Sequence, residues 1–146
     1  MFFWFIGTSI ATIWFVFHDK KFAYQLVVAG ALAPDAIEVF LGHAGPLHSL
    51  VTMVAIMAVV MLITYGRKKS RSKMLAFVIG MFLHLVFDGA FTNTKMFWWP
   101  ISGLQFGDYA LPVFDRGLIN IPLEIIGVIL ILWTRKQVNN DQVSQT

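Results

Sequence analysis

The sequence predicts an all-α integral membrane bundle of about five helices with a short extracytoplasmic loop region. Three observations indicate this fold class. Apolar residues make up 58% of the 146-residue chain and charged residues only 13%, the mean hydropathy is +0.71, and the basic residues gather between apolar runs. A soluble domain of this size needs more polar surface than this composition provides.

Five apolar segments follow one another along the chain, and we predict a helix for each. They occupy residues 2–17, 22–41, 47–65, 74–91 and 118–134. A helix needs about 20 residues to cross about 30 Å of hydrocarbon, so the shorter segments would tilt little or be sheltered by their neighbours. All five belong to one predicted transmembrane domain, residues 1–146, with a polar tail at 137–146.

Local signals support these segments in order. The first carries no charged residue. The second contains Pro34, which bends or restarts a helix and frees backbone groups at that depth. The third begins after a turn at Gly45 and Pro46. The fourth contains Ala76 and Gly80, a small-xxx-small pattern suited to close helix packing. The fifth ends where the chain becomes polar.

The charged connections predict the direction of each helix. Basic residues follow the first, third and fifth segments, and by the positive-inside rule these connections are cytoplasmic. The N-terminus, the turn at 42–46 and the loop at 92–117 then lie outside, and the C-terminus is cytoplasmic. Because the basic residues flank apolar runs and do not line an amphipathic face, we expect no nucleic acid partner. Nine of the eleven basic residues lie in these three connections: Lys20, Lys21, Arg67, Lys68, Lys69, Arg71, Lys73, Arg135 and Lys136. Lys95 and Arg116 lie elsewhere.

Six ionisable residues lie in or beside the apolar segments, where an unpaired charge is costly. With the predicted topology, all six fall toward the extracytoplasmic side of the bundle. Scattered buried polar residues have no reason to converge in depth, so this agreement favours a single site. The six residues are Asp35, Glu38, His43, His48, His84 and Asp88.

Spacing sharpens this grouping. His84 and Asp88 are four residues apart and share a helix face, so they could hold one ion together. Asp35 and Glu38 are three apart and also share a face. The chain has no cysteine, so any metal must be bound through His, Asp and Glu. The alternative for a histidine such as His84 is a hydrogen bond to a neighbouring carbonyl or hydroxyl group.

Glu124 lies near the outer end of the fifth segment and has three alternatives. It could join the candidate site, pack against Asn120, or pair with Arg116.

The order of several motifs resembles that of a known family. The motifs are Pro34-Asp35, His43-Ala-Gly-Pro-Leu-His48-Ser49, His84-Leu-Val-Phe-Asp88 and Trp99-Pro100. Their arrangement is similar to the bacterial family of predicted membrane-bound metal-dependent hydrolases, which is itself distantly similar to the zinc-dependent phospholipase C group. The resemblance covers about residues 30–100 and implies a multi-pass protein of the bacterial inner (plasma) membrane.

This resemblance also implies an activity. Asp35, His48, His84 and Asp88 would be ligands of a divalent metal, with zinc expected as one or two ions. Glu38 or His43 would then be the general base. The substrate would be a phosphoester, lipid or lipid-linked, reached at the extracytoplasmic face, and membrane lipids would be the partners.

The chain departs from the pattern of that family, and the departures leave a second hypothesis open. Ala44 stands where the family has Arg, Leu47 where it has Thr, and Phe3 near the place of an N-terminal His. Without the Arg, a natural phosphate-binding cation is missing. The second hypothesis is a non-catalytic membrane protein, or an accessory subunit bound to other membrane subunits, that retains a structural metal or polar cluster.

Overall fold

The computed structural model describes residues 1–40, 45–104 and 117–143. Within these ranges the chain is helical and contains no strand, so the predicted all-α class is confirmed. Four short elements accompany the long helices: the 3-10 turns η1 (Pro46–His48), η2 (Ala90–Thr92) and η3 (Gly117–Ile119), and the short helix α5 (Thr94–Phe97). The long helices are α1 (Phe2–Phe17), α2 (Tyr24–Glu38), α3 (Leu50–Ile63), α4 (Lys68–Phe87) and α7 (Asn120–Val143).

The five predicted segments correspond to these five long helices, with differences at the ends. Helix α1 has the predicted bounds. Helix α4 begins at Lys68, well before the expected start at residue 74, because lysine and arginine are good helix formers that hydropathy does not register. Helix α7 also continues beyond its predicted end, through polar residues to Val143. Helix α2 runs through Pro34 without a break and ends at Glu38, short of the predicted residue 41.

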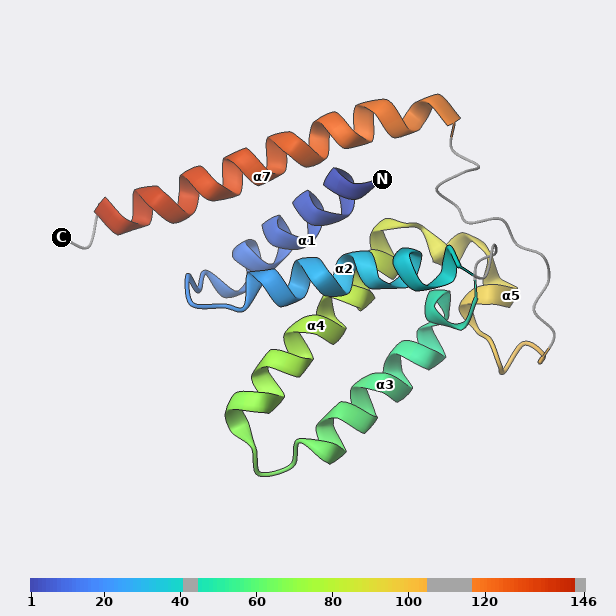
Figure 1. The fold of residues 1–146 in the computed structure, drawn as a ribbon. Coiled ribbons are helices and arrows are strands. Elements are labelled where there is room, and N and C mark those ends of the chain that lie inside the picture. Colours follow the sequence, from blue (N-terminus) through green and yellow to red (C-terminus); the bar gives the residue numbers. More distant parts are fainter. Residues whose placement is uncertain (41–44, 105–116, 144–146) are drawn as a thin grey trace.

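The helices alternate in direction across the bundle (Figure 1). Helices α1 and α7 lie side by side, while α4 packs against α2 on one side and α3 on the other. The α1–α2 connection, the α3–α4 connection and the end of α7 all lie on the left in Figure 1, and η1 and α5 lie on the right. The three basic connections therefore share one end of the bundle, as the topology prediction requires.

The crossing of α2 and α4 brings backbone against backbone. A Cβ atom on Gly30 would lie 1.9 Å from the carbonyl oxygen of Phe77, and one on Gly80 would lie 2.1 Å from the carbonyl oxygen of Val27. Only glycine fits at such distances. The small-xxx-small pattern predicted for the fourth segment therefore marks this crossing.

A second glycine contact joins α1 and α7. A Cβ atom on Gly7 would lie 2.2 Å from the carbonyl oxygen of Gly127, and one on Gly127 would lie 2.2 Å from that of Phe3. This contact holds the last long helix against the first, far from it in the sequence.

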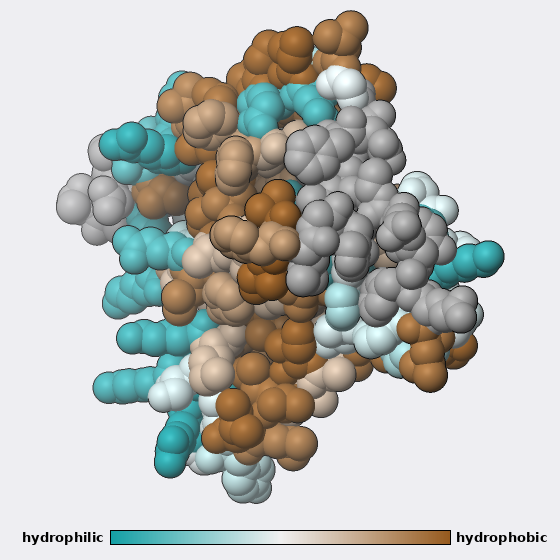
Figure 2. Space-filling model, turned by 45° about the vertical axis from the view of Figure 1, so that its right-hand side comes forward, coloured by the Kyte–Doolittle hydropathy of each residue, from teal (hydrophilic) through white to brown (hydrophobic). Residues whose placement is uncertain are grey.

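Two clusters of buried side chains fill the bundle. One joins α1, α2 and α4 around Ile13 and Val27, and the other joins α3, α4, η2 and α5 around Met53 and Met81. Large apolar side chains also cover much of the outside; Leu62, for example, is 74% exposed. Figure 2 shows a broad hydrophobic area in the middle of one face, with hydrophilic side chains along its left edge. A surface of this kind suits hydrocarbon better than water.

Candidate metal centre

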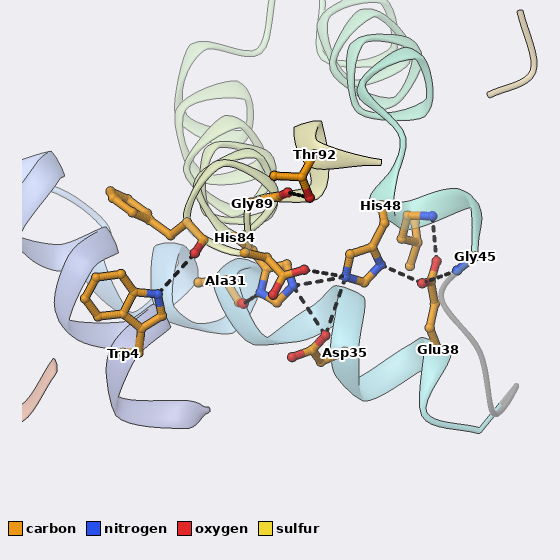
Figure 3. A network of polar contacts seen from close by, with 12 residues as sticks. Trp4, Ala31, Asp35, Glu38, Gly45, His48, His84, Gly89 and Thr92 are labelled. Atoms are coloured by element: carbon orange, nitrogen blue, oxygen red, sulfur yellow. Dashed lines mark hydrogen bonds and ion pairs between the residues drawn. The ribbon is translucent and has the colours of Figure 1, made fainter. Parts of the chain in front are cut away.

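Three elements bring the candidate ligands together at one end of the bundle (Figure 3). Helix α2 supplies Asp35, η1 supplies His48, and the end of α4 supplies His84, with Asp88 at its C-cap. Gly89, at φ 68°, turns the chain away immediately after Asp88. This left-handed conformation is one that glycine adopts without strain.

The ligand atoms lie close together. The Nε2 atoms of His48 and His84 are 3.3 Å apart. The Oδ1 atom of Asp35 is 3.3 Å from Nε2 of His84 and 3.6 Å from Nε2 of His48. One ligand atom from each of these three residues lies within 4.8 Å of the others. Asp88 adjoins the group, with its Oδ2 atom 3.7 Å from Nε2 of His48. Of the four residues expected as ligands, Asp35, His48 and His84 therefore meet in one place, and Asp88 adjoins them through His48.

Both histidines are oriented through their other ring nitrogen. Nδ1 of His84 donates to the carbonyl oxygen of Ala31 at 2.7 Å, which fixes the tautomer because a carbonyl can only accept. Pro34, one turn further along α2, has no N–H group, so the carbonyl of Gly30, the residue before Ala31, receives no helical hydrogen bond from it. Nδ1 of His48 donates to Oε2 of Glu38 at 2.6 Å. In the neutral ring, each Nε2 atom then presents a lone pair to the cluster.

Glu38 binds the segment that carries His48. Its carboxylate accepts the backbone N–H groups of Gly45 and Leu47 at 2.5 and 2.6 Å, in addition to the ring of His48. A Cβ atom on Gly45 would lie 3.0 Å from Oε1 of Glu38, so the absence of a side chain there lets the carboxylate approach. Glu38 is fully buried. All three donors come from the turn that precedes α3, so the carboxylate fixes that turn against α2.

The cluster is closed except at one residue. His48 and His84 are fully buried, and Asp88 is 1% exposed. The side chain of Asp35 is 23% exposed. The ring of Phe5 covers His84 from α1, with ring centroids 4.1 Å apart. A ligand or water molecule therefore approaches beside Asp35.

The spacing of these atoms fits a divalent metal. Zinc bonds of about 2.0–2.1 Å in tetrahedral geometry separate neighbouring ligand atoms by about 3.3–3.4 Å. Among Asp35, His48 and His84, two of the separations match this value and the third is 3.6 Å. Asp88 lies outside the group of three whose ligand atoms are all within 4.8 Å of one another. Two imidazoles and two carboxylates are also a donor set that zinc and similar ions accept. The group can therefore hold a metal ion.

The comparison with protein families identifies the kind of protein. Residues 3–140 match the family described as "YdjM inner membrane protein". The chain belongs to this family. No curated protein and no solved structure is significantly similar to it. The resemblance drawn from the sequence is thus confirmed as far as a bacterial membrane protein family, and the description of the YdjM family states no activity.

Two helices of this YdjM-family protein are long and apolar enough to cross a membrane, at Lys68–Phe87 and Gly117–Asn140. Helices α1 and α3 are apolar but shorter. Together with the family description, these spans support an inner membrane protein. The crossing of the membrane by all five segments and the cytoplasmic C-terminus stay predictions.

The other candidate residues lie in different surroundings. His43 lies outside the described residues. Glu124 accepts the backbone N–H of Phe3 at 2.8 Å, so this carboxylate caps the first turn of α1. Of the three alternatives for Glu124, pairing with Arg116 falls outside the described residues, and packing against Asn120 stays a prediction.

Sequence reasoning about the YdjM-family protein missed two contributors to the site. The carbonyl of Ala31 is a backbone acceptor, and no side-chain pattern indicates it. Ser49 donates its hydroxyl to the carbonyl oxygen of Trp99 at 2.5 Å. That bond ties the turn carrying His48 to the chain after α5. Ser49 and Trp99 both stand in motifs that carried the resemblance, so the sequence held a signal for this contact.

Proposed function

We propose that this protein is a membrane-bound metal-dependent hydrolase of phosphoesters. In this proposal Asp35, His48, His84 and Asp88 hold one zinc ion. The substrate is a lipid or lipid-linked phosphoester at the extracytoplasmic face. The supporting observation is the pair of histidine Nε2 atoms, 3.3 Å apart and each left with a lone pair by its own Nδ1 hydrogen bond.

The metal part of the proposal follows from that pair. Two lone pairs at this distance repel each other unless a proton or a cation lies between them. The carboxylates of Asp35 and Asp88 add negative charge on the same side, which favours a cation of higher charge than a proton. A bound divalent ion would polarise a phosphoryl oxygen and activate water for its attack.

The residues of the chain have separate tasks in this proposal. Glu38 is assigned a positioning role, because its hydrogen-bond donors among the described residues all belong to the turn that carries His48. A carboxylate on the far nitrogen of a metal-binding histidine orients the ring and raises its basicity. His43 keeps the predicted role of general base. Asp35, the partly exposed ligand, lies where the substrate would enter.

The substrate class is supported by the position of the cluster. It lies at the end of the bundle opposite the three basic connections (Figure 1). If those connections are cytoplasmic, the cluster faces the extracytoplasmic headgroup region, where a lipid phosphoester can reach it. The hydrolytic reaction itself rests on the motif resemblance.

The test begins with metal content. Elemental mass spectrometry of the detergent-purified protein is expected to give about one equivalent of zinc, with at least a tenfold loss in His48→Ala and in Asp88→Asn. Asp88→Asn keeps the size of the side chain, so folding is retained. The matched control is His18→Asn at the opposite end of the bundle, where φ is 48° and asparagine is tolerated. This control should keep its metal.

Activity is then measured on bis(p-nitrophenyl) phosphate and on a short-chain phospholipid. Hydrolysis that stops with a chelator and returns with zinc would support the proposal. A folded protein without metal would contradict it. Metal without hydrolysis would favour the alternative of a structural metal in a non-catalytic membrane protein, which the nearly complete burial of three ligands supports.

A further inference from the structure

A second feature lies at the end of the bundle away from the histidine cluster. A cavity of about 230 Å³ is bounded by α1, the start of α2 and the second half of α7. Ile10 and Ile131 give it apolar walls, and Lys20 and Arg135 add two cations. Lys20 comes from the α1–α2 connection and Arg135 from helix α7, and the fold brings the two cations to one cavity. The cavity surface is mostly apolar, and two cationic residues are among those that line it.

Thr134 lines the same cavity and is 1% exposed. Its hydroxyl has no hydrogen-bond partner among the described residues. Three other threonines, Thr8, Thr12 and Thr64, donate to the carbonyl four residues earlier in their helices. A buried hydroxyl without a partner is costly, so the position of Thr134 favours a ligand that accepts its hydrogen bond.

The two cations also lack an anionic partner in the described ranges. Among residues 1–40, 45–104 and 117–140, no carboxylate forms an ion pair with Lys20 or Arg135. The side chain of nearby Asp19 instead accepts the backbone N–H of Lys21 at 2.8 Å. The charge of the cavity is thus available to an anion.

We propose that this cavity binds an anionic phospholipid. The phosphate lies between Lys20 and Arg135, and the Thr134 hydroxyl donates to an oxygen of the headgroup or the ester. The acyl chains run along the outside of α7, where Leu132 is 60% exposed and Trp133 44%. Basic pockets between membrane helices on the cytoplasmic side hold lipid headgroups in this way. This site is separate from the histidine cluster and does not depend on hydrolysis.

The experiment uses native mass spectrometry of the full chain released from detergent with phosphatidylglycerol or phosphatidylcholine added. The parent is expected to retain one phosphatidylglycerol in preference to phosphatidylcholine. Lys20→Gln with Arg135→Gln should weaken phosphatidylglycerol binding by at least about tenfold, given roughly 1 kcal/mol for each cation near an anionic lipid. Thr134→Val, of similar shape, should weaken it about threefold, as expected for one lost hydrogen bond.

The matched control is Lys68→Gln with Lys69→Gln, which removes the same charge from α4 outside the cavity. It should change binding less than twofold, and Lys20→Arg with Arg135→Lys should retain it. An equal loss in the control would show general surface attraction and overturn the proposal. No preference for phosphatidylglycerol in the parent would also overturn it, as would its displacement by inorganic phosphate at millimolar concentration.

Discussion

The two glycine contacts of the bundle resemble each other in geometry and differ in what they carry. At both, a Cβ atom would lie about 2 Å from a carbonyl oxygen of the opposing helix. Helices α2 and α4 then continue from their contact to Asp35, His84 and Asp88. Helices α1 and α7 carry none of these ligands. The comparison teaches that close helix packing fixes the candidate site at one crossing and only attaches a helix at the other.

The neighbours of each helix explain why the two contacts should respond differently to change. Helix α4 is packed against α1, α2 and α3, so it cannot move without disturbing the core. Helix α7 packs chiefly against α1, and 11% of its most apolar stretch is buried. A clash at α7 can therefore be relieved by a small shift of one helix.

The largest effect is expected for Gly80→Ala. The new Cβ atom would meet the backbone of α2, and neither helix can yield, so the free energy of unfolding should fall by about 3 kcal/mol or more. Zinc binding should be lost as well, because α2 and α4 would no longer hold their ligands in register. Unfolding is followed by titration with sodium dodecyl sulfate, beside Ala55→Val on the exposed face of α3. Unchanged stability with zinc retained would contradict the assigned role of this crossing.

The next largest effect is expected for a change in the metal centre that leaves the α2–α4 glycine contact intact. Glu38→Gln keeps the size of the side chain but removes the charge that orients His48, so zinc affinity should fall about 10- to 100-fold. Chelator competition measures the affinity. The control is Glu124→Gln, which alters a carboxylate that also accepts a backbone N–H but serves α1. Equal zinc affinity in Glu38→Gln and the parent would remove Glu38 from the positioning role.

Gly127→Ala sharpens the comparison from the other side. Because α7 can shift, we expect a loss of only about 1–2 kcal/mol in the free energy of unfolding. Zinc content should stay at the parent level. Both are measured as for Gly80→Ala. Loss of zinc from a folded Gly127→Ala protein would show that the two contacts are not independent.

The smallest effect is expected for Ser49→Ala. The variant loses the hydrogen bond to Trp99, worth about 1 kcal/mol when buried, and leaves the ligands in place. Thermal unfolding in detergent measures the change. Ser102→Ala serves as the control, since its hydroxyl bonds to Lys95 on an exposed segment. A larger loss in Ser102→Ala than in Ser49→Ala would refute this ranking.

The sequence was informative about helix identity and less so about helix ends. Apolar runs located all five long helices, because burial in lipid or in a core requires them. The start of α4 at Lys68 escaped prediction because charged residues can extend a helix into the headgroup region. The close contacts of Gly30 and Gly127 could not be predicted, since a glycine in a helical segment does not indicate which other helix packs against it.

For the candidate site, helical spacing and depth predicted that Asp35, His48, His84 and Asp88 would converge. Spacing could not predict which ring nitrogen of each histidine faces the cluster, because that choice depends on acceptors from distant segments. It also could not separate Glu38 from Asp35. The two share a helix face, but one meets the backbone of a turn and the other meets two imidazoles.

The long sequence separation within the cluster has a consequence for biogenesis. Ala31 and His84 are 53 residues apart, and a chain is synthesised from its N-terminus. If α2 crosses the membrane as predicted, it reaches the bilayer with Asp35 before its partners on α4 have been made. A carboxylate without a partner is costly there, so we expect α2 to stay at the insertion machinery until α4 arrives and the two helices enter the bilayer as a pair.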